Sequence, residues 1–172
     1  AMVSRVSILV LGLLAEGERH GYDLFREMGE RGLLRWTHAS KVAAYKALAR
    51  LEEEGCLASW TERGANTPEK RVYSLTEQGT EKLRDLVYAL CSSQDPLPLD
   101  ACVGLYFVRH LAPAEAVEAL ERRLGFMEAQ ERRLRREMGL TRGLAGGLMP
   151  EILRHELTVY REEARWLKRV MS

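Results

Sequence analysis

Apolar positions recur at helical spacing through the N-terminal half of the chain. Residues 4–15 are apolar on nearly every side, which predicts a helix at the centre of a small core. A second amphipathic segment follows a turn at residues 16–19. Residues 40–55 form a third, in which Ser40 is a good N-cap and Gly55 suits the left-handed conformation that ends a helix. The pattern therefore predicts three consecutive helices.

The periodicity changes after the third helix. Residues 57–63 and 70–75 are short segments rich in β-branched and aromatic residues, and a turn-forming stretch separates them. Thr76 then suits the N-cap of another helix with apolar residues at i, i+3, i+4 and i+7. The order helix, helix, helix, hairpin, helix is that of a winged helix, which is a DNA-binding variant of the helix-turn-helix.

The C-terminal half reads as helical, so the predicted fold class is mainly α with a small β-hairpin. Prolines in residues 92–99 mark a linker between a winged-helix DNA-binding domain (1–91) and a helical dimerisation domain (100–172). The helical domain carries two heptad-like apolar stripes, which need partners. They can pair within one chain, across a two-fold axis, or both. We expect a homodimer, because two DNA-reading domains match a palindromic site.

Composition limits how the chain can bind nucleic acid. The net charge is only +1, so a DNA contact must come from a local basic patch rather than from bulk charge. The 3 cysteines form no Cys-x-x-Cys pair, which favours reduced thiols and a cytoplasmic protein. Val6 to Leu14 is apolar but too short to span a bilayer, so we expect no membrane partner.

Four motifs resemble those of the PadR family of bacterial transcriptional regulators. They are Ile8-Leu9-Val10-Leu11-Gly12-Leu13-Leu14, His20-Gly21-Tyr22, Tyr45 followed by residues 47–55, and Tyr73-Ser74-Leu75-Thr76-Glu77-Gln78-Gly79. The resemblance covers most of residues 4–90; the C-terminal half resembles the family only in being helical and heptad-like. It implies a winged-helix repressor that binds a palindromic operator in double-stranded DNA. It also implies that a small hydrophobic or aromatic ligand, bound near the dimer interface, releases the DNA.

Two segments depart from the family's pattern. The family usually has a Gly-Ser-Ile-like segment before Tyr45 and a proline after it, where this chain has Val42-Ala43-Ala44 and Lys46. In the hairpin, Pro68-Glu69-Lys70-Arg71 stands for the usual Pro-Pro-Arg-Lys. We therefore expect a related docking on a different operator, with the acidic Glu69 affecting how closely the hairpin approaches phosphate.

The predicted DNA contacts lie on the third helix and the hairpin. Lys46 and Arg50 are one turn apart and are expected to point outward, so that one reaches a guanine edge while the other meets a phosphate. Tyr45 can donate to a phosphate oxygen. The full set is Lys41, Tyr45, Lys46, Arg50, Arg63, Lys70 and Arg71. The alternative is that these residues only keep the surface soluble, with Lys70 or Arg71 paired across the strands with Glu62 or Glu69.

Aromatic residues provide candidates for an effector site. They are Trp36, Tyr106 and Trp166. The alternative is that they are ordinary core residues. Cys91 and Cys102 with His110 or His155 could in principle hold a metal, but their spacing matches no common ligand pattern, so we predict no metal site.

His20 and Tyr22 are interpreted as residues that pack and cap the second helix. We find no Gly-rich phosphate loop, nucleophile motif or recognisable His–carboxylate frame, and so predict neither catalysis nor a cofactor. Two other classes of function remain compatible with the sequence. The low net charge and Glu69 are compatible with a winged-helix module for protein assembly, and a metal-sensing repressor is the third reading.

Overall fold

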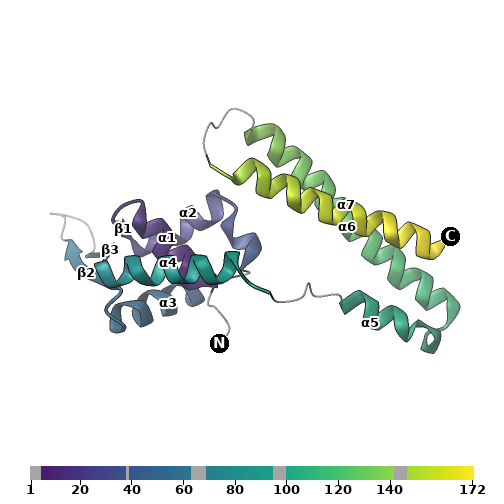
Figure 1. The fold of residues 1–172 in the computed structure, drawn as a ribbon, viewed down its shortest axis with the longest axis horizontal. Helices are drawn as coiled ribbons and strands as arrows, with labels where there is room; N and C mark the ends of the chain where they lie inside the picture. Colours follow the sequence, from purple (N-terminus) through teal and green to yellow (C-terminus); the bar gives the residue numbers. More distant parts are fainter. Residues whose placement is uncertain (1–4, 38, 63–68, 95–99, 142–146) are drawn as a thin grey trace. The chain divides into compact units, whose positions relative to one another are not determined.

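The structure, a computed structural model, describes residues 5–37, 39–62, 69–94, 100–141 and 147–172. The chain divides into two compact units, residues 1–96 and 97–172 (Figure 1). Helices dominate both units, and a small antiparallel sheet lies in the first, so the predicted fold class is confirmed. The predicted linker, 92–99, extends beyond the described residues and stays a prediction.

The first unit is built around a central helix. Its elements are α1 (Arg5–Ala15), β1 (Arg19–His20), α2 (Gly21–Glu30), the 3-10 helix η1 (Leu33–Trp36), α3 (Lys41–Glu53), β2 (Leu57–Glu62), β3 (Lys70–Leu75) and α4 (Glu77–Cys91). Helix α1 contacts α2, α3, α4 and β3. Because its residues are apolar on nearly every side, other elements can cover it all round, and Val10 and Leu11 are fully buried.

The sheet has three antiparallel strands in the order β1–β3–β2. Strands β2 and β3 form the predicted hairpin. Strand β1 corrects the sequence analysis, which placed Arg19 in a turn and His20 in the second helix: Arg19 pairs with Tyr73 and His20 with Val72. Two residues are too short to show the alternation by which strands are recognised in a sequence. The extra strand joins the start of α2 directly to the hairpin.

Side-chain caps fix the start of α3 and of α4, as predicted. Ser40 accepts a hydrogen bond from a first-turn backbone N–H (3.2 Å), and Thr76 accepts one from Gly79 (3.0 Å). Gly55 ends α3 with a φ of 73°, where L side chains are strained. Gly79 is required for a different reason, since a Cβ there would lie 2.0 Å from the carbonyl oxygen of Cys56. Helix α4 therefore starts directly against the backbone that follows α3.

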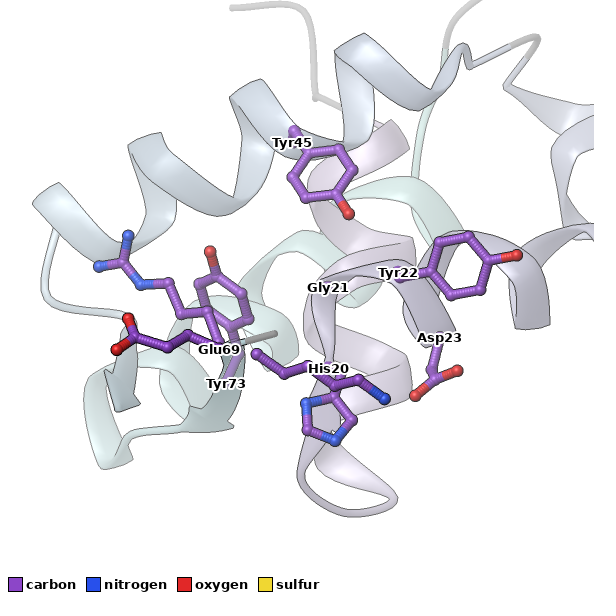
Figure 2. Close-up of a pocket in the computed structure, with 9 residues that line it drawn as sticks. His20, Gly21, Tyr22, Asp23, Tyr45, Glu69 and Tyr73 are labelled. Atoms are coloured by element: carbon purple, nitrogen blue, oxygen red, sulfur yellow. The ribbon is translucent and has the colours of Figure 1, made fainter. Parts of the chain in front are cut away.

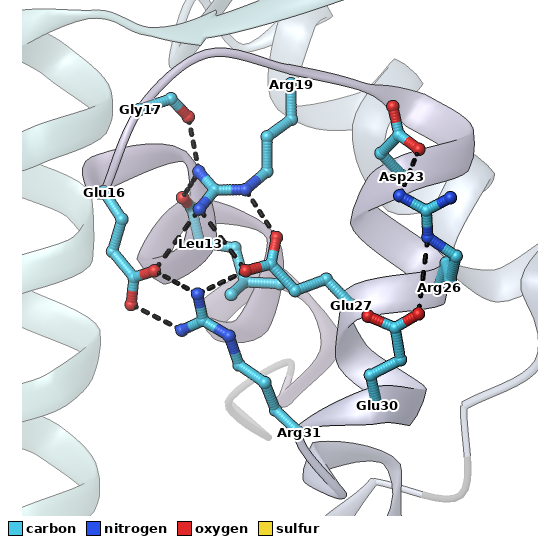
Figure 3. Close-up of polar contacts among 9 residues, drawn as sticks. All are labelled: Leu13, Glu16, Gly17, Arg19, Asp23, Arg26, Glu27, Glu30 and Arg31. Atoms are coloured by element: carbon cyan, nitrogen blue, oxygen red, sulfur yellow. Dashed lines mark hydrogen bonds and ion pairs between the residues drawn. The ribbon is translucent and has the colours of Figure 1, made fainter. Parts of the chain in front are cut away.

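A cluster of ion pairs joins the end of α1 to β1 and α2 (Figure 3). Arg19 donates to the Leu13 carbonyl and to the Glu27 carboxylate (2.6 Å). Arg31 bridges Glu27 and Glu16 (2.7 Å to Glu16). The hydrogen bond from Arg19, followed by the contacts of Arg31, holds the pKa of Glu27 below its usual range. The cluster satisfies a terminal carbonyl of α1 and anchors β1.

The second unit is a helical hairpin preceded by shorter helices. Its elements are α5 (Asp100–Tyr106), the 3-10 helix η2 (Val108–His110), α6 (Pro113–Thr141) and α7 (Met149–Met171). The two predicted stripes pair with each other in antiparallel fashion. Their buried residues form two clusters, Met127 with Ala164 and Leu167, and Leu134 with Leu153 and Leu157. Across the described ranges, no helix is long and apolar enough to cross a membrane.

Candidate nucleic-acid interface

Helix α3 has one buried side and one exposed side. The buried side consists of Ala44, Ala47, Leu48 and Leu51. The opposite side, which we call the α3 outer face, is a shallow and mainly apolar depression lined by Lys41, Val42, Tyr45, Lys46 and Ala49. Val42 is 63% exposed although it is apolar. Small apolar groups flanked by ammonium groups suit a DNA groove, where thymine methyls and phosphates are both within reach.

The two cations predicted one turn apart on α3 have different surroundings. Lys46 is exposed, and it forms no hydrogen bond or ion pair with any residue that the structure describes. Arg50 instead donates to the hydroxyl of Ser7 (2.6 Å) and lies 3.6 Å from Glu54. Ser7 is 1% exposed and needs a partner for its hydroxyl. Arg50 is exposed, as expected, with 52% of its side chain accessible, and it also braces α3 against α1; its predicted DNA contact stays a prediction.

Arg71 ties the hairpin to α3. Its guanidinium donates to both carboxylate oxygens of Glu52 (2.8 and 2.9 Å) and to Ser59 (2.7 Å). Ser59 also donates to Glu52 (2.6 Å), which completes a triangle of bonds. The acidic partner of Arg71 is thus on the helix and not across the strands. Lys70 is exposed at the start of β3. Arg63, the third cation predicted for the hairpin, lies outside the described residues.

A pocket of about 310 Å³ opens between the start of α2, α3 and β3 (Figure 2). Its lining consists of His20, Gly21, Tyr22, Asp23, Tyr45, Glu69, Lys70, Arg71 and Tyr73. A Cβ on Gly21 would lie 3.2 Å from the Tyr45 ring and 3.3 Å from the Tyr73 ring. Burial raises the pKa of Tyr73. The glycine of the His-Gly-Tyr motif thus allows α2 to approach both α3 and the sheet.

His20 and Tyr22, the other two residues of that motif, do not have the packing and capping roles that the sequence suggested. Tyr22 is 57% exposed, and the Lys41 ammonium lies 5.1 Å from the centre of its ring. The same ammonium lies 6.0 Å from the ring of Tyr45, so Lys41 is within cation–π range of two rings. His20 occupies the N-cap position of α2, but its side chain makes no capping hydrogen bond.

The three aromatic residues predicted for an effector site differ in burial and in their contacts. Trp36 is half-buried in η1 of the first unit. Tyr106 is 79% exposed and contacts Phe107 edge-on, with ring centres 4.9 Å apart. Trp166 packs against the α6–α7 core. The effector site stays a prediction. Within the described parts of the chain, no group of three or more His, Cys, Asp or Glu side chains could hold a metal ion.

Comparison with known proteins agrees with these observations. Residues 10–85, which run from α1 into α4, match the family model described as the Transcriptional regulator PadR-like family. This part of the chain belongs to the PadR-like family. That family comprises transcriptional regulators, which are not an enzyme class. The match includes α2, α3 and the hairpin, and so contains the α3 outer face and the pocket beside it.

Solved structures share the fold of this chain along most of its length. The chain is 27% identical over 121 residues to the negative transcriptional regulator PadR of Bacillus subtilis. The alignment covers 70% of this chain and 66% of that protein, so the chain spans just under two thirds of the relative's length. The structure of Bacillus subtilis PadR with operator DNA has a TM-score of 0.74 at 24% identity and covers 95% of both chains. The same protein with p-coumaric acid gives 0.74 at 22% identity, covering 96% of both. A Streptococcus mutans protein gives 0.72 at 21%, covering 99% of both.

Proposed function

We propose that this PadR-like protein is a double-stranded DNA-binding transcriptional regulator that acts as a homodimeric repressor on a palindromic operator. The observation that carries the proposal is the α3 outer face. There Lys46, which pairs with no described residue, lies beside the exposed Val42 and Ala49 on a helix that begins at an exposed N-terminal cap. In a major groove the ammonium can reach guanine acceptors or a phosphate, and the apolar groups can contact thymine methyls.

The hairpin supports the same docking. Arg71 is held against α3 by Glu52, and Ser59 of β2 bonds to both, so β3 keeps a fixed position relative to the helix that would enter the groove. Lys70 then projects next to the pocket edge, where a backbone phosphate can approach it. With a net charge of only +1, binding depends on this local group of cations.

The proposed homodimer is supported by the second unit. Pairing α6 with α7 buries one side of each helix but leaves Phe126 (53%) and Val159 (52%) exposed. A second copy of the chain would cover such residues and would bring two winged helices to half-sites about one helical turn apart. A protein that acts on bacterial operators works in the cytoplasm, which is the location we propose.

We also propose that a small hydrophobic or aromatic effector releases the DNA. The support is the relative solved with p-coumaric acid and the exposed ring of Tyr106 in this chain. Trp36 and Trp166 would report such binding, because tryptophan fluorescence changes when a ligand alters its surroundings. Titration with phenolic acids, followed by DNA release, is the corresponding test.

Binding to duplex fragments from the gene's own upstream region tests the regulator proposal. Fluorescence anisotropy should detect one fragment bound with a Kd between roughly 10⁻⁸ and 10⁻¹¹ M, and weak binding to the others. Lys46→Ala should weaken the specific complex by roughly 1–3 kcal/mol, the range for one base-edge contact.

Arg84→Ala is the matched control, because it removes one positive charge from an exposed position of α4 in the same unit. It should leave the affinity for the specific fragment nearly unchanged. The proposal is wrong if the wild-type protein binds every fragment equally weakly, or if the Lys46 and Arg84 variants lose the same affinity.

A further inference from the structure

Two aromatic rings hold the first lysine of α3. The Lys41 ammonium lies 5.1 Å from the ring centre of Tyr22, on α2, and 6.0 Å from that of Tyr45, on α3. An exposed lysine normally samples many side-chain conformations, because its four-carbon stem is flexible. Attraction to two ring faces restricts those conformations. The ammonium is therefore held at the edge of the α3 outer face.

The charge of this ammonium is not cancelled by a nearby acid. Within the described ranges Lys41 forms no ion pair. Asp23 lines the adjacent pocket, but its carboxylate lies 2.8 Å from Arg26, which balances it. Glu69 also lines this pocket, but it belongs to the segment that leads into β3. Among the described residues of α2 and α3, no carboxylate therefore pairs with the Lys41 ammonium.

We propose that Tyr22, Lys41 and Tyr45 form one binding site for a backbone phosphate of duplex DNA, in which Tyr22 is a positioning residue for the Lys41 ammonium. The inference rests on the function proposed above. Phosphate suits the site because a compact ammonium attracts an anion from any direction, and the Tyr45 hydroxyl can donate a second hydrogen bond. A contact of this kind fixes the register of the protein on DNA and does not read its sequence.

The exposure of Tyr22 makes the idea testable without unfolding the protein. The ring is 57% exposed, and α2 is anchored by other residues, Leu24 (1% exposed) and Met28 (0%). Replacing Tyr22 therefore leaves the core intact. Thermal unfolding of each variant checks this point before DNA binding is measured.

The test measures the affinity for the specific fragment over a series of salt concentrations. Lys41→Ala should make the log–log salt dependence shallower by about 0.9, the value for one phosphate contact. Tyr22→Ala should weaken binding about two- to five-fold, which corresponds to one exposed cation–π contact. Tyr22→Phe keeps the ring and should bind like the wild type. The double variant should bind no more weakly than Lys41→Ala, because the ring acts through the ammonium.

Other outcomes overturn the inference in distinguishable ways. If the wild type binds the fragment but Tyr22→Ala has no effect, or its effect adds fully to that of Lys41→Ala, Tyr22 does not position the lysine and the proposed function stands. If Tyr22→Phe is as weak as Tyr22→Ala, the hydroxyl matters and not the ring, and the positioning role is wrong. If the wild type binds no fragment, the proposed function fails and the phosphate site fails with it.

Discussion

Glycines at element contacts of the first unit have surroundings opposite to those of the α6 glycines in the second, although Gly12 of α1 is as open as the latter. In the first unit a Cβ on Gly79 would lie 2.0 Å from a backbone oxygen, and one on Gly21 would press on two tyrosine rings. In the second unit a Cβ on Gly125 or Gly139 of α6 would meet nothing within 4 Å. In the first unit, short motifs at the contacts between elements thus determine how those elements pack. The second unit is specified by a repeating pattern of apolar residues, which leaves its exposed α6 glycines open to substitution.

The polar contacts differ in the same way. In the first unit several join residues far apart in the chain, such as Arg50 with Ser7 and Arg71 with Glu52, beside local pairs such as Arg26 with Asp23. In the second unit most run along one helix, as between Arg135 and Glu131, although Arg123 reaches Glu163 on the facing helix. Contacts that join distant elements fix the position of the α3 outer face relative to the hairpin. A surface that reads DNA requires such a fixed geometry.

The largest expected effect is that of Gly79→Ala. The added methyl group collides with the backbone, so α4 cannot start where it does, and the first unit should lose on the order of 4 kcal/mol or more. The matched change, Gly125→Ala, fills open space on a helix and should stabilise α6 by about 1 kcal/mol. Urea unfolding followed by circular dichroism measures both. Equal effects in the two units would contradict the comparison.

Leu134→Ala should have the next largest effect. Leu134 is 0% exposed between α6 and α7, so its truncation leaves a cavity that costs about 2–5 kcal/mol. Leu140→Ala is the control, because that side chain is 83% exposed and the variant should unfold like the wild type. A Leu134 variant with unchanged denaturant stability would mean that the α6–α7 pairing described here is wrong.

These differences explain which parts of the structure could be predicted from the sequence. Ser40, Gly55 and Thr76 were assigned correctly as helix ends, because capping depends on residues within one turn. The heptad spacing likewise predicted α6 and α7. Strand β1 was missed, since it exists only by pairing with Tyr73, far along the chain.

The candidate site was predictable only in part, for the same reason. Periodicity placed Lys46 and Arg50 on the exposed side of α3, but it could not show that Arg50 also bonds to Ser7, which is 43 residues away in sequence. Nor could it show that Tyr22 is exposed beside Lys41, because that proximity depends on how α2 packs against α3. A tyrosine after a helix-starting glycine gives no signal of this kind.

Glu27→Gln should have a smaller, pH-dependent effect on the first unit. The pKa of Glu27 is lowered in the folded state, chiefly by Arg19, so its contribution to stability is present above its unfolded pKa, about 4.3, and is lost as the pH falls through the folded pKa. At neutral pH the variant should be less stable by about 1–2 kcal/mol, a value reduced by partial exposure.

Thermal unfolding between pH 7 and pH 3 measures this difference. The wild type should lose more stability over that interval than the Gln variant, because the variant has no carboxylate to protonate. Parallel pH profiles for the two proteins would show that the ion pairs of Glu27 do not stabilise the first unit.

Ser7→Ala is expected to have the smallest effect. It removes the buried acceptor of Arg50 and should cost about 1 kcal/mol, with no change in the salt dependence of DNA binding. Arg50→Ala should cost a similar amount of stability. Chemical denaturation and salt titration of both variants measure the two properties. If Arg50→Ala instead made the salt dependence shallower by about 0.9, Arg50 would be a phosphate contact and not a brace.

The central claim is that the α3 outer face enters the DNA groove. Amide chemical-shift mapping on addition of the specific duplex tests it most directly. The account predicts that the largest shifts fall in residues 41–49 and in β3 near Lys70, while the facing sides of α6 and α7 change little. Large shifts confined to α6 and α7, with residues 41–49 unchanged, would contradict it.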